Sequence, residues 1–240
     1  MMQRDDGLPV WLALLVDALS EQLGDADNVK AFGASITQAS QRGASLTPAA
    51  SVLILAMLDD LALWAPVAAR PAALVTALAA IRTLHEAGAS GHHRTPADWK
   101  AARRMALAAT DALTDPDQLA LARCVETAAW DPARSSSCVY DTMRVWRSAL
   151  SDKTVREFGW TDADDKDMET TLKQLYDSYL LPAPHLKLTV FDLLEEHYPE
   201  KALRLSENYR HQRECAARTT RRATDMLLGA LGATQGVVSD

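Results

Sequence analysis

Residues that cap helices stand directly before proline at several points of the chain. Thr47-Pro48, Thr95-Pro96, Asp115-Pro116 and Asp131-Pro132 each offer a side-chain oxygen to the free N–H groups of a first helical turn. Proline is favoured at the first helical position, because its missing N–H is not needed there and its φ is already helical. These pairs predict helix starts. We expect helices over 8–23, 27–41, 48–64, 71–87, 96–113, 116–130, 136–149, 162–180, 190–197 and 199–228.

The spacing of apolar residues also favours helices. Apolar residues recur at intervals of three and four, whereas the strict alternation of Val, Ile and aromatic residues that is typical of strands is almost absent. We therefore predict an all-α fold, a single compact domain of about ten helices over residues 1–240, with helices 48–64 and 71–87 at its centre. A subdivision would fall near 181–186, where Pro182 and Pro184 interrupt the helical pattern before the long C-terminal helix at 199–228.

Composition excludes several classes of protein. Of the 240 residues, 48% are hydrophobic and the formal net charge is −7, so the chain is neither disordered nor basic like a dedicated nucleic-acid binder. The three cysteines, Cys124, Cys138 and Cys215, are too few and too far apart for a disulfide framework or a zinc cluster. We expect reduced thiols and a cytoplasmic location. The most apolar region, 52–81, is interrupted by charged residues, which argues against a membrane span.

Asp59 and Asp60 lie in an otherwise apolar predicted helix. Helical enzymes that bind diphosphates through Mg²⁺ need a third aspartate one turn later, and this chain has Leu63 there. We therefore expect Asp59 and Asp60 to lie at a solvated helix edge or in a salt bridge between helices.

Two further sets of residues carry metal-ligating side chains. Glu207, His211 and Glu214 share one face of the last helix, but a di-iron bundle needs a Glu-x-x-His on each of two helices. His92 and His93 are adjacent in a glycine-flanked loop and cannot comfortably point at one ion. We predict no metal and no cofactor.

Acidic residues are concentrated in the third quarter of the chain. Residues 150–197 contain 11 acids and 5 bases. A calcium loop starting at Asp162 is excluded, because Asp167 and Lys173 stand where Gly and Glu are needed. The acids either stabilise a helix N-terminus or form an acidic docking surface. If they form a docking surface, nearby aromatic residues would join it. The candidate partner-binding residues are then Trp160, Asp162, Asp164, Asp165, Tyr176 and Tyr179.

The segments 97–112 (ADWKAARRMALAATDA) and 128–131 (AAWD) are rich in alanine around tryptophan and aspartate. In this they resemble the helices of alanine-rich, all-helical proteins described as bacterial immunity proteins. The resemblance implies an all-helical protein that neutralises a toxin partner. It ends before residue 136 and carries over no functional residue.

These observations favour a protein-binding module of the immunity, antitoxin or adaptor type. Its partner would be a protein, such as a basic toxin or effector, because the predicted surface is acidic. Two alternatives stay open. One is a helical enzyme whose metal- or carboxylate-based site is assembled from scattered residues. The other is a regulator that contacts nucleic acid through the C-terminal arginines Arg210, Arg213, Arg221 and Arg222.

The last predicted helix is unusually long and its apolar face is weak. That face is formed by Ala202, Leu205, Tyr209, Ala216, Ala223 and Leu227. A helix of this length must bury one face along its length, since propensity alone does not hold it. We therefore predict that part of it packs against a second copy of the chain in a two-fold homodimer.

Overall fold

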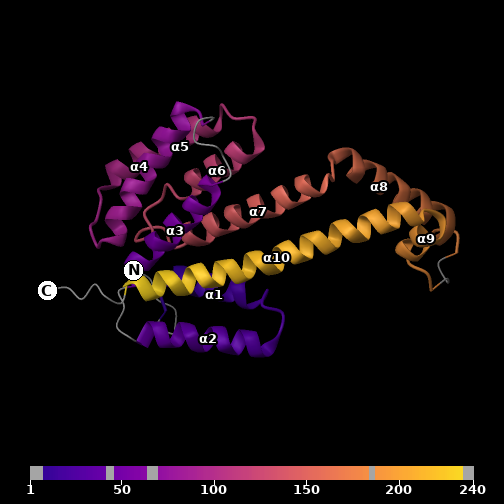
Figure 1. Cartoon of the computed structure of the whole chain (residues 1–240), viewed down its shortest axis with the longest axis horizontal. Helices are drawn as coiled ribbons and strands as arrows, with labels where there is room; N and C mark the ends of the chain where they lie inside the picture. The colour runs from indigo at the N-terminus through magenta and orange to yellow at the C-terminus, as the bar shows by residue number, and fades with distance from the viewer. Residues whose placement is uncertain (1–7, 42–45, 64–69, 184–186, 235–240) are drawn as a thin grey trace. The chain divides into compact units, whose positions relative to one another are not determined.

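The computed structural model describes residues 8–41, 46–63, 70–183 and 187–234 (Figure 1). In these ranges the chain forms ten α-helices and one π-helical segment, η2, and no strand, which confirms the predicted all-α fold of about ten helices. The elements are α1 (Val10–Ser20), α2 (Ala26–Gln41), α3 (Leu46–Ala62), α4 (Ala72–Ala89), α5 (Pro96–Thr110), α6 (Pro116–Thr127), α7 (Cys138–Phe158), α8 (Asp162–Leu175), η2 (Tyr176–Leu180), α9 (Val190–His197) and α10 (Pro199–Ala233).

The helices form two compact units. Unit 1 comprises Met1–Ala149 and Ala217–Asp240, and unit 2 comprises Leu150–Ala216. Both boundaries fall inside helices, in α7 and α10, whereas the sequence suggested a subdivision near 181–186. Part of that turn, residues 184–186, lies outside the described residues.

Unit 1 is organised around α3. Leu53, Ile54, Met57, Leu58 and Leu61 of this helix are buried on more than one side, as expected for a central helix. In turn, α4 packs on α3, α5 on α4 and α6 on α5, and α6 also contacts α3 and α4 (Figure 1). The predicted central position of the helices at 48–64 and 71–87 agrees with this arrangement.

The predicted caps are confirmed at two of the four prolines. The prediction for Thr47-Pro48 is wrong, because α3 already begins at Leu46 and Pro48 is therefore not its first residue. Thr95 forms a capping box with Asp98 at the start of α5, and the Asp115 side chain accepts the N–H of Gln118 at the start of α6. The prediction for Asp131-Pro132 is wrong. There the Asp131 carboxylate accepts the N–H of Ala133 at 3.0 Å in a turn, because aspartate caps turns as readily as helices, and α7 begins only at Cys138.

Unit 2 has a small core of its own. Trp160, Met168, Leu175, Leu193, Leu194 and Leu205 are buried together, contributed by the α7–α8 connection, α8, α9 and α10. Leu205 therefore packs within one chain and is not available to a second copy, contrary to its predicted place in a dimer interface. Two other residues of the predicted apolar face, Tyr209 and Ala216, are exposed, and Asn208 and Cys215 are buried in their place. The homodimer itself stays a prediction.

All three cysteines are buried, and none of them forms a disulfide within the described residues. Burial raises the pKa of the Cys138 thiol to about 12, and its Sγ–H donates to the carbonyl of Trp130 at 3.2 Å. Burial likewise raises the pKa of Cys124 far above its usual range. Thiols held neutral in this way are poor nucleophiles.

His85 of α4 is fully buried in unit 1. Its Nε2 donates to the carbonyl oxygen of Ala128 at 2.8 Å, so Nδ1 carries no proton and faces the Ser51 hydroxyl at 3.4 Å. Burial lowers the pKa of His85 from 6.5 to about 4, because the charged imidazolium cannot be hydrated there. The folded protein thus holds this histidine neutral.

We expect His85 to make the protein less stable as the pH is lowered. The unfolded chain takes up a proton at this residue near pH 6.5, and the folded protein only near pH 4. The stability that depends on a neutral His85 is therefore present above pH 6.5 and is lost as the pH falls to 4. Between about pH 8 and pH 5 the free energy of unfolding, measured in urea, should fall by about 2 kcal/mol through this residue. His85→Gln should remove this loss, whereas His92→Gln, in an exposed loop, should keep it. The same pH dependence in His85→Gln as in the natural chain would contradict the expectation.

Candidate functional site

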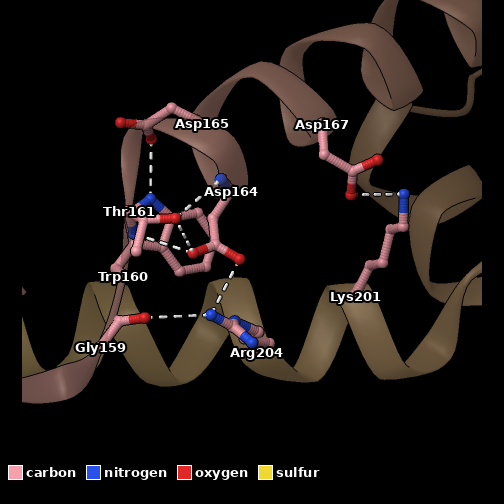
Figure 2. A network of polar contacts seen from close by, with 8 residues as sticks. All are labelled: Gly159, Trp160, Thr161, Asp164, Asp165, Asp167, Lys201 and Arg204. Atoms are coloured by element: carbon pink, nitrogen blue, oxygen red, sulfur yellow. Dashed lines mark hydrogen bonds and ion pairs between the residues drawn. The ribbon is translucent and has the colours of Figure 1, made fainter.

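Helix α8 of unit 2 begins with a run of acidic residues. This acidic run consists of Asp162, Asp164, Asp165, Asp167 and Glu169. Thr161 caps the helix: its hydroxyl accepts the N–H of Asp164, and the Asp164 carboxylate accepts the Thr161 N–H at 2.8 Å and hydroxyl at 2.7 Å (Figure 2). These hydrogen bonds from Thr161 lower the pKa of Asp164 below its usual range. Asp162 and Asp165 share the same first turn, where the helix dipole favours negative charge. The predicted stabilisation of a helix N-terminus is confirmed.

Two carboxylates of α8 are neutralised by α10. Asp164 pairs with Arg204 at 2.8 Å, and Asp167 pairs with Lys201 at 2.6 Å (Figure 2). In each helix the two partners are three residues apart, so one face of α8 meets one face of α10. Arg204 also donates to the carbonyl of Gly159 at 3.2 Å. The acidic run is therefore less negative toward a partner than its sequence suggests.

Trp160 belongs to the core of unit 2. Its side chain is only 6% exposed, and its indole N–H donates to the Asp165 carboxylate at 2.7 Å (Figure 2). Arg204 lies 5.6 Å from the ring centroid. Of the candidate partner-binding residues, Trp160, Asp164 and Asp165 thus serve the fold, and Asp162 remains exposed.

Tyr176 and Tyr179 are exposed on η2, by 50% and 42%. The N–H of Leu181 donates to the carbonyl of Tyr176 at 2.9 Å, and this hydrogen bond closes the wider π-helical turn on which both tyrosines lie. Tyr179 stacks on His197 at the end of α9, with ring centroids 4.7 Å apart. Tyr198 follows, also exposed, with Lys201 Nζ 5.6 Å from its ring. We call Tyr176, Tyr179, His197 and Tyr198 the tyrosine surface.

The tyrosine surface has unneutralised acids beside it. Glu195, Glu196 and Glu200 are exposed, and within the described part of the chain none of them pairs with a cation. Unit 2 as a whole has 14 acids and 9 bases, a net charge of −5. Sequence reasoning missed His197, Tyr198 and these glutamates, because they join Tyr179 only when α9 folds against α8.

Asp59 and Asp60 form salt bridges between helices, which is one of the two possibilities that the sequence left open. Asp59 pairs with Arg82 of α4. The buried Asp60 carboxylate accepts the indole N–H of Trp146 at 2.8 Å and pairs with Arg222 of α10. Arg222 is therefore already engaged within unit 1, which weakens the prediction that it contacts nucleic acid.

The other candidate metal ligands are not brought together. Over the described ranges, no three side chains of His, Cys, Asp or Glu converge to hold an ion. The His211 ring lies against Phe158, with centroids 4.9 Å apart, while Glu214 points to solvent. His92 and His93 are exposed in the loop after α4.

Among the helices that the structure describes, none has the length and apolar character needed to cross a bilayer. Comparison with models of known protein families, with curated proteins and with solved structures finds no match to this chain. The tyrosine surface of unit 2, with its unneutralised glutamates, is therefore the candidate site on its own chemistry.

Proposed function

We propose that the protein is a cytoplasmic protein-binding module, of the immunity, antitoxin or adaptor type, whose partner docks on the tyrosine surface of unit 2. The observation that carries this proposal is the exposure of both Tyr176 and Tyr179 on the five-residue segment η2. Tyrosine is enriched at the centres of protein interfaces, because its rigid ring buries a large area and its hydroxyl still finds a hydrogen bond.

The charge around the tyrosine surface indicates a basic partner. Glu195, Glu196 and Glu200 carry negative charge that no cation of the described chain neutralises, and unit 2 carries a net −5. A field of one sign steers an oppositely charged partner and penalises an acidic one. The acids of α8 contribute less than the sequence suggested, since Arg204 and Lys201 neutralise Asp164 and Asp167.

The test is affinity capture from the native host with the natural chain and with Tyr179→Ala. We expect a protein captured by the natural chain to be lost, or bound at least about tenfold more weakly, in Tyr179→Ala, since a central aromatic residue commonly contributes that much. Its affinity for the natural chain should fall as salt rises, because screening weakens charge attraction.

Tyr209→Ala is the matched control. Tyr209 is in the same unit and is 47% exposed, against 42% for Tyr179, but it lies on α10 and is not part of the tyrosine surface. Loss of the partner in both variants, or in neither, would contradict the proposal. Equal circular dichroism spectra would show that both variants keep the fold.

A further inference from the structure

A cleft of about 340 Å³ opens in unit 1, far from the acidic run in sequence. One wall is α5, which contributes Trp99, Lys100 and Arg103. The other wall is the connection between α6 and α7, with Trp130 and Arg134. The α5 residues are spaced by three and four, so they share one face of the helix. The volume is that of a small-molecule site.

The cleft is positively charged. Lys100, Arg103 and Arg134 line it, and Asp131 is the one acid among its lining residues, which leaves a net charge of +2. Asp131 lies 3.8 Å from Arg134. Within the described part of the chain, no carboxylate pairs with Lys100 or Arg103. Lys100 and Arg103 therefore provide two positive charges that can bind an anion from outside the protein.

Arg103 is held in place by Trp130. Its guanidinium carbon lies 3.9 Å from the centroid of the half-exposed indole, at the distance of a stacked cation–π pair. A guanidinium stacked on one face keeps the N–H groups of its edge free, and these match two oxygens of a phosphate or carboxylate. Because the side chain is already ordered, little conformational entropy is lost on binding.

Residues of both walls of the cleft contact the same buried side chain, that of His85. The Trp99 ring packs edge-on against His85, with centroids 5.1 Å apart, and His85 bonds the carbonyl of Ala128 next to the cleft. From the other side the Cys138 thiol bonds the carbonyl of Trp130. The distance between the walls is thus fixed by core contacts, as in a preformed binding site.

We propose that this cleft binds a phosphomonoester that carries a planar or apolar group. The dianionic phosphate complements the net +2 and is held by Lys100, Arg103 and Arg134, and the organic group occupies the remaining volume against Trp99, Ala129 and Trp130. This site is separate from the tyrosine surface and takes a small molecule, so it goes beyond the protein-binding function proposed above.

Titration calorimetry with three probes tests the proposal. Adenosine 5′-monophosphate has both the phosphate and a planar ring, inorganic phosphate has only the anion, and adenosine has only the ring. We expect the monophosphate to bind one per chain, and each of the other two to bind at least about tenfold more weakly, since each lacks one set of contacts. No binding of the monophosphate at millimolar concentration would overturn the proposal. Equal affinity for inorganic phosphate would overturn the part of it that concerns the organic group.

Variants assign the binding to the cleft. Arg103→Met removes the charge and keeps an apolar stem, and should weaken the monophosphate at least about tenfold. Arg104→Met is the matched control, because Arg104 is exposed and does not line the cleft. Lys100→Gln, at an exposed position, supplies a second test should Arg103→Met fail to fold. Equal affinities for Arg103→Met and Arg104→Met, or for Lys100→Gln and the natural chain, would place the ligand elsewhere and overturn the assignment.

Discussion

Replacing Arg222 with Met will lower the free energy of unfolding by about 3 kcal/mol. Asp60 is only 4% exposed, and its carboxylate has two partners, the Trp146 indole N–H and the Arg222 guanidinium. Without Arg222 the carboxylate stays buried with a single donor and no counter-charge. The Arg222 side chain is 53% exposed, so water screens the pair in part, and the loss stays at the lower end of that measured for buried ion pairs. Unfolding in urea at neutral pH measures it.

A second substitution separates charge from packing. Asp60→Asn in the Arg222→Met background keeps an oxygen for the Trp146 N–H and removes the buried charge, so we expect it to recover part of the loss. Arg221→Met is the control. Arg221 is the exposed neighbour of Arg222, and its replacement should change stability by less than about 0.5 kcal/mol. If Arg222→Met costs no more than Arg221→Met, the ion pair does not stabilise unit 1.

Asp60 also shows where sequence reasoning stops. The sequence left two possibilities for Asp59 and Asp60, a solvated helix edge or a salt bridge between helices. Its partners are 86 residues away at Trp146 and 162 residues away at Arg222, and no local pattern connects positions so distant. By contrast, the Thr161–Asp164 cap spans three residues, and its spacing alone predicts it.

The end of α7 could have been predicted more closely than it was. The prediction stopped at residue 149, but residues 150–158 contain neither Gly nor Pro, and the helix continues to Phe158. Gly159 then takes a left-handed φ of 77°. The N–H of Trp160 bonds the carbonyl of Val155, and the N–H of Gly159 bonds that of Arg156, the hydrogen bonds of a Schellman motif. The glycine was the sequence signal for this helix end.

The candidate site was predicted only in part, for a related reason. The sequence-based prediction placed Trp160, the acids and the tyrosines on one surface because they are close in sequence. In the folded chain Trp160 is buried in the core, whereas Tyr176 and Tyr179 are exposed. His197 joined the tyrosine surface from 18 residues away, through a ring contact that no periodicity encodes.

Leu205→Asp will unfold unit 2. Leu205 is 6% exposed and packs in the core that also holds Trp160, Met168, Leu175 and Leu194. The substitution removes a buried leucine and places a charge among apolar side chains, which together cost more than about 4 kcal/mol. A unit with so small a core cannot absorb that loss. We expect reduced helical circular dichroism and rapid proteolysis confined to residues 150–216.

Tyr209→Asp separates this outcome from the disruption of a dimer. Tyr209 is one turn further along α10 and is exposed, so its replacement should leave helix content unchanged and shift stability by less than about 0.5 kcal/mol. If Leu205 instead packed against a second copy, Leu205→Asp would keep its helix content and halve the mass found by light scattering. The buried position of Leu205 requires a different result, because this leucine packs against side chains of its own chain. Leu205→Asp should lose helix content, and the dependence of stability on protein concentration should not change.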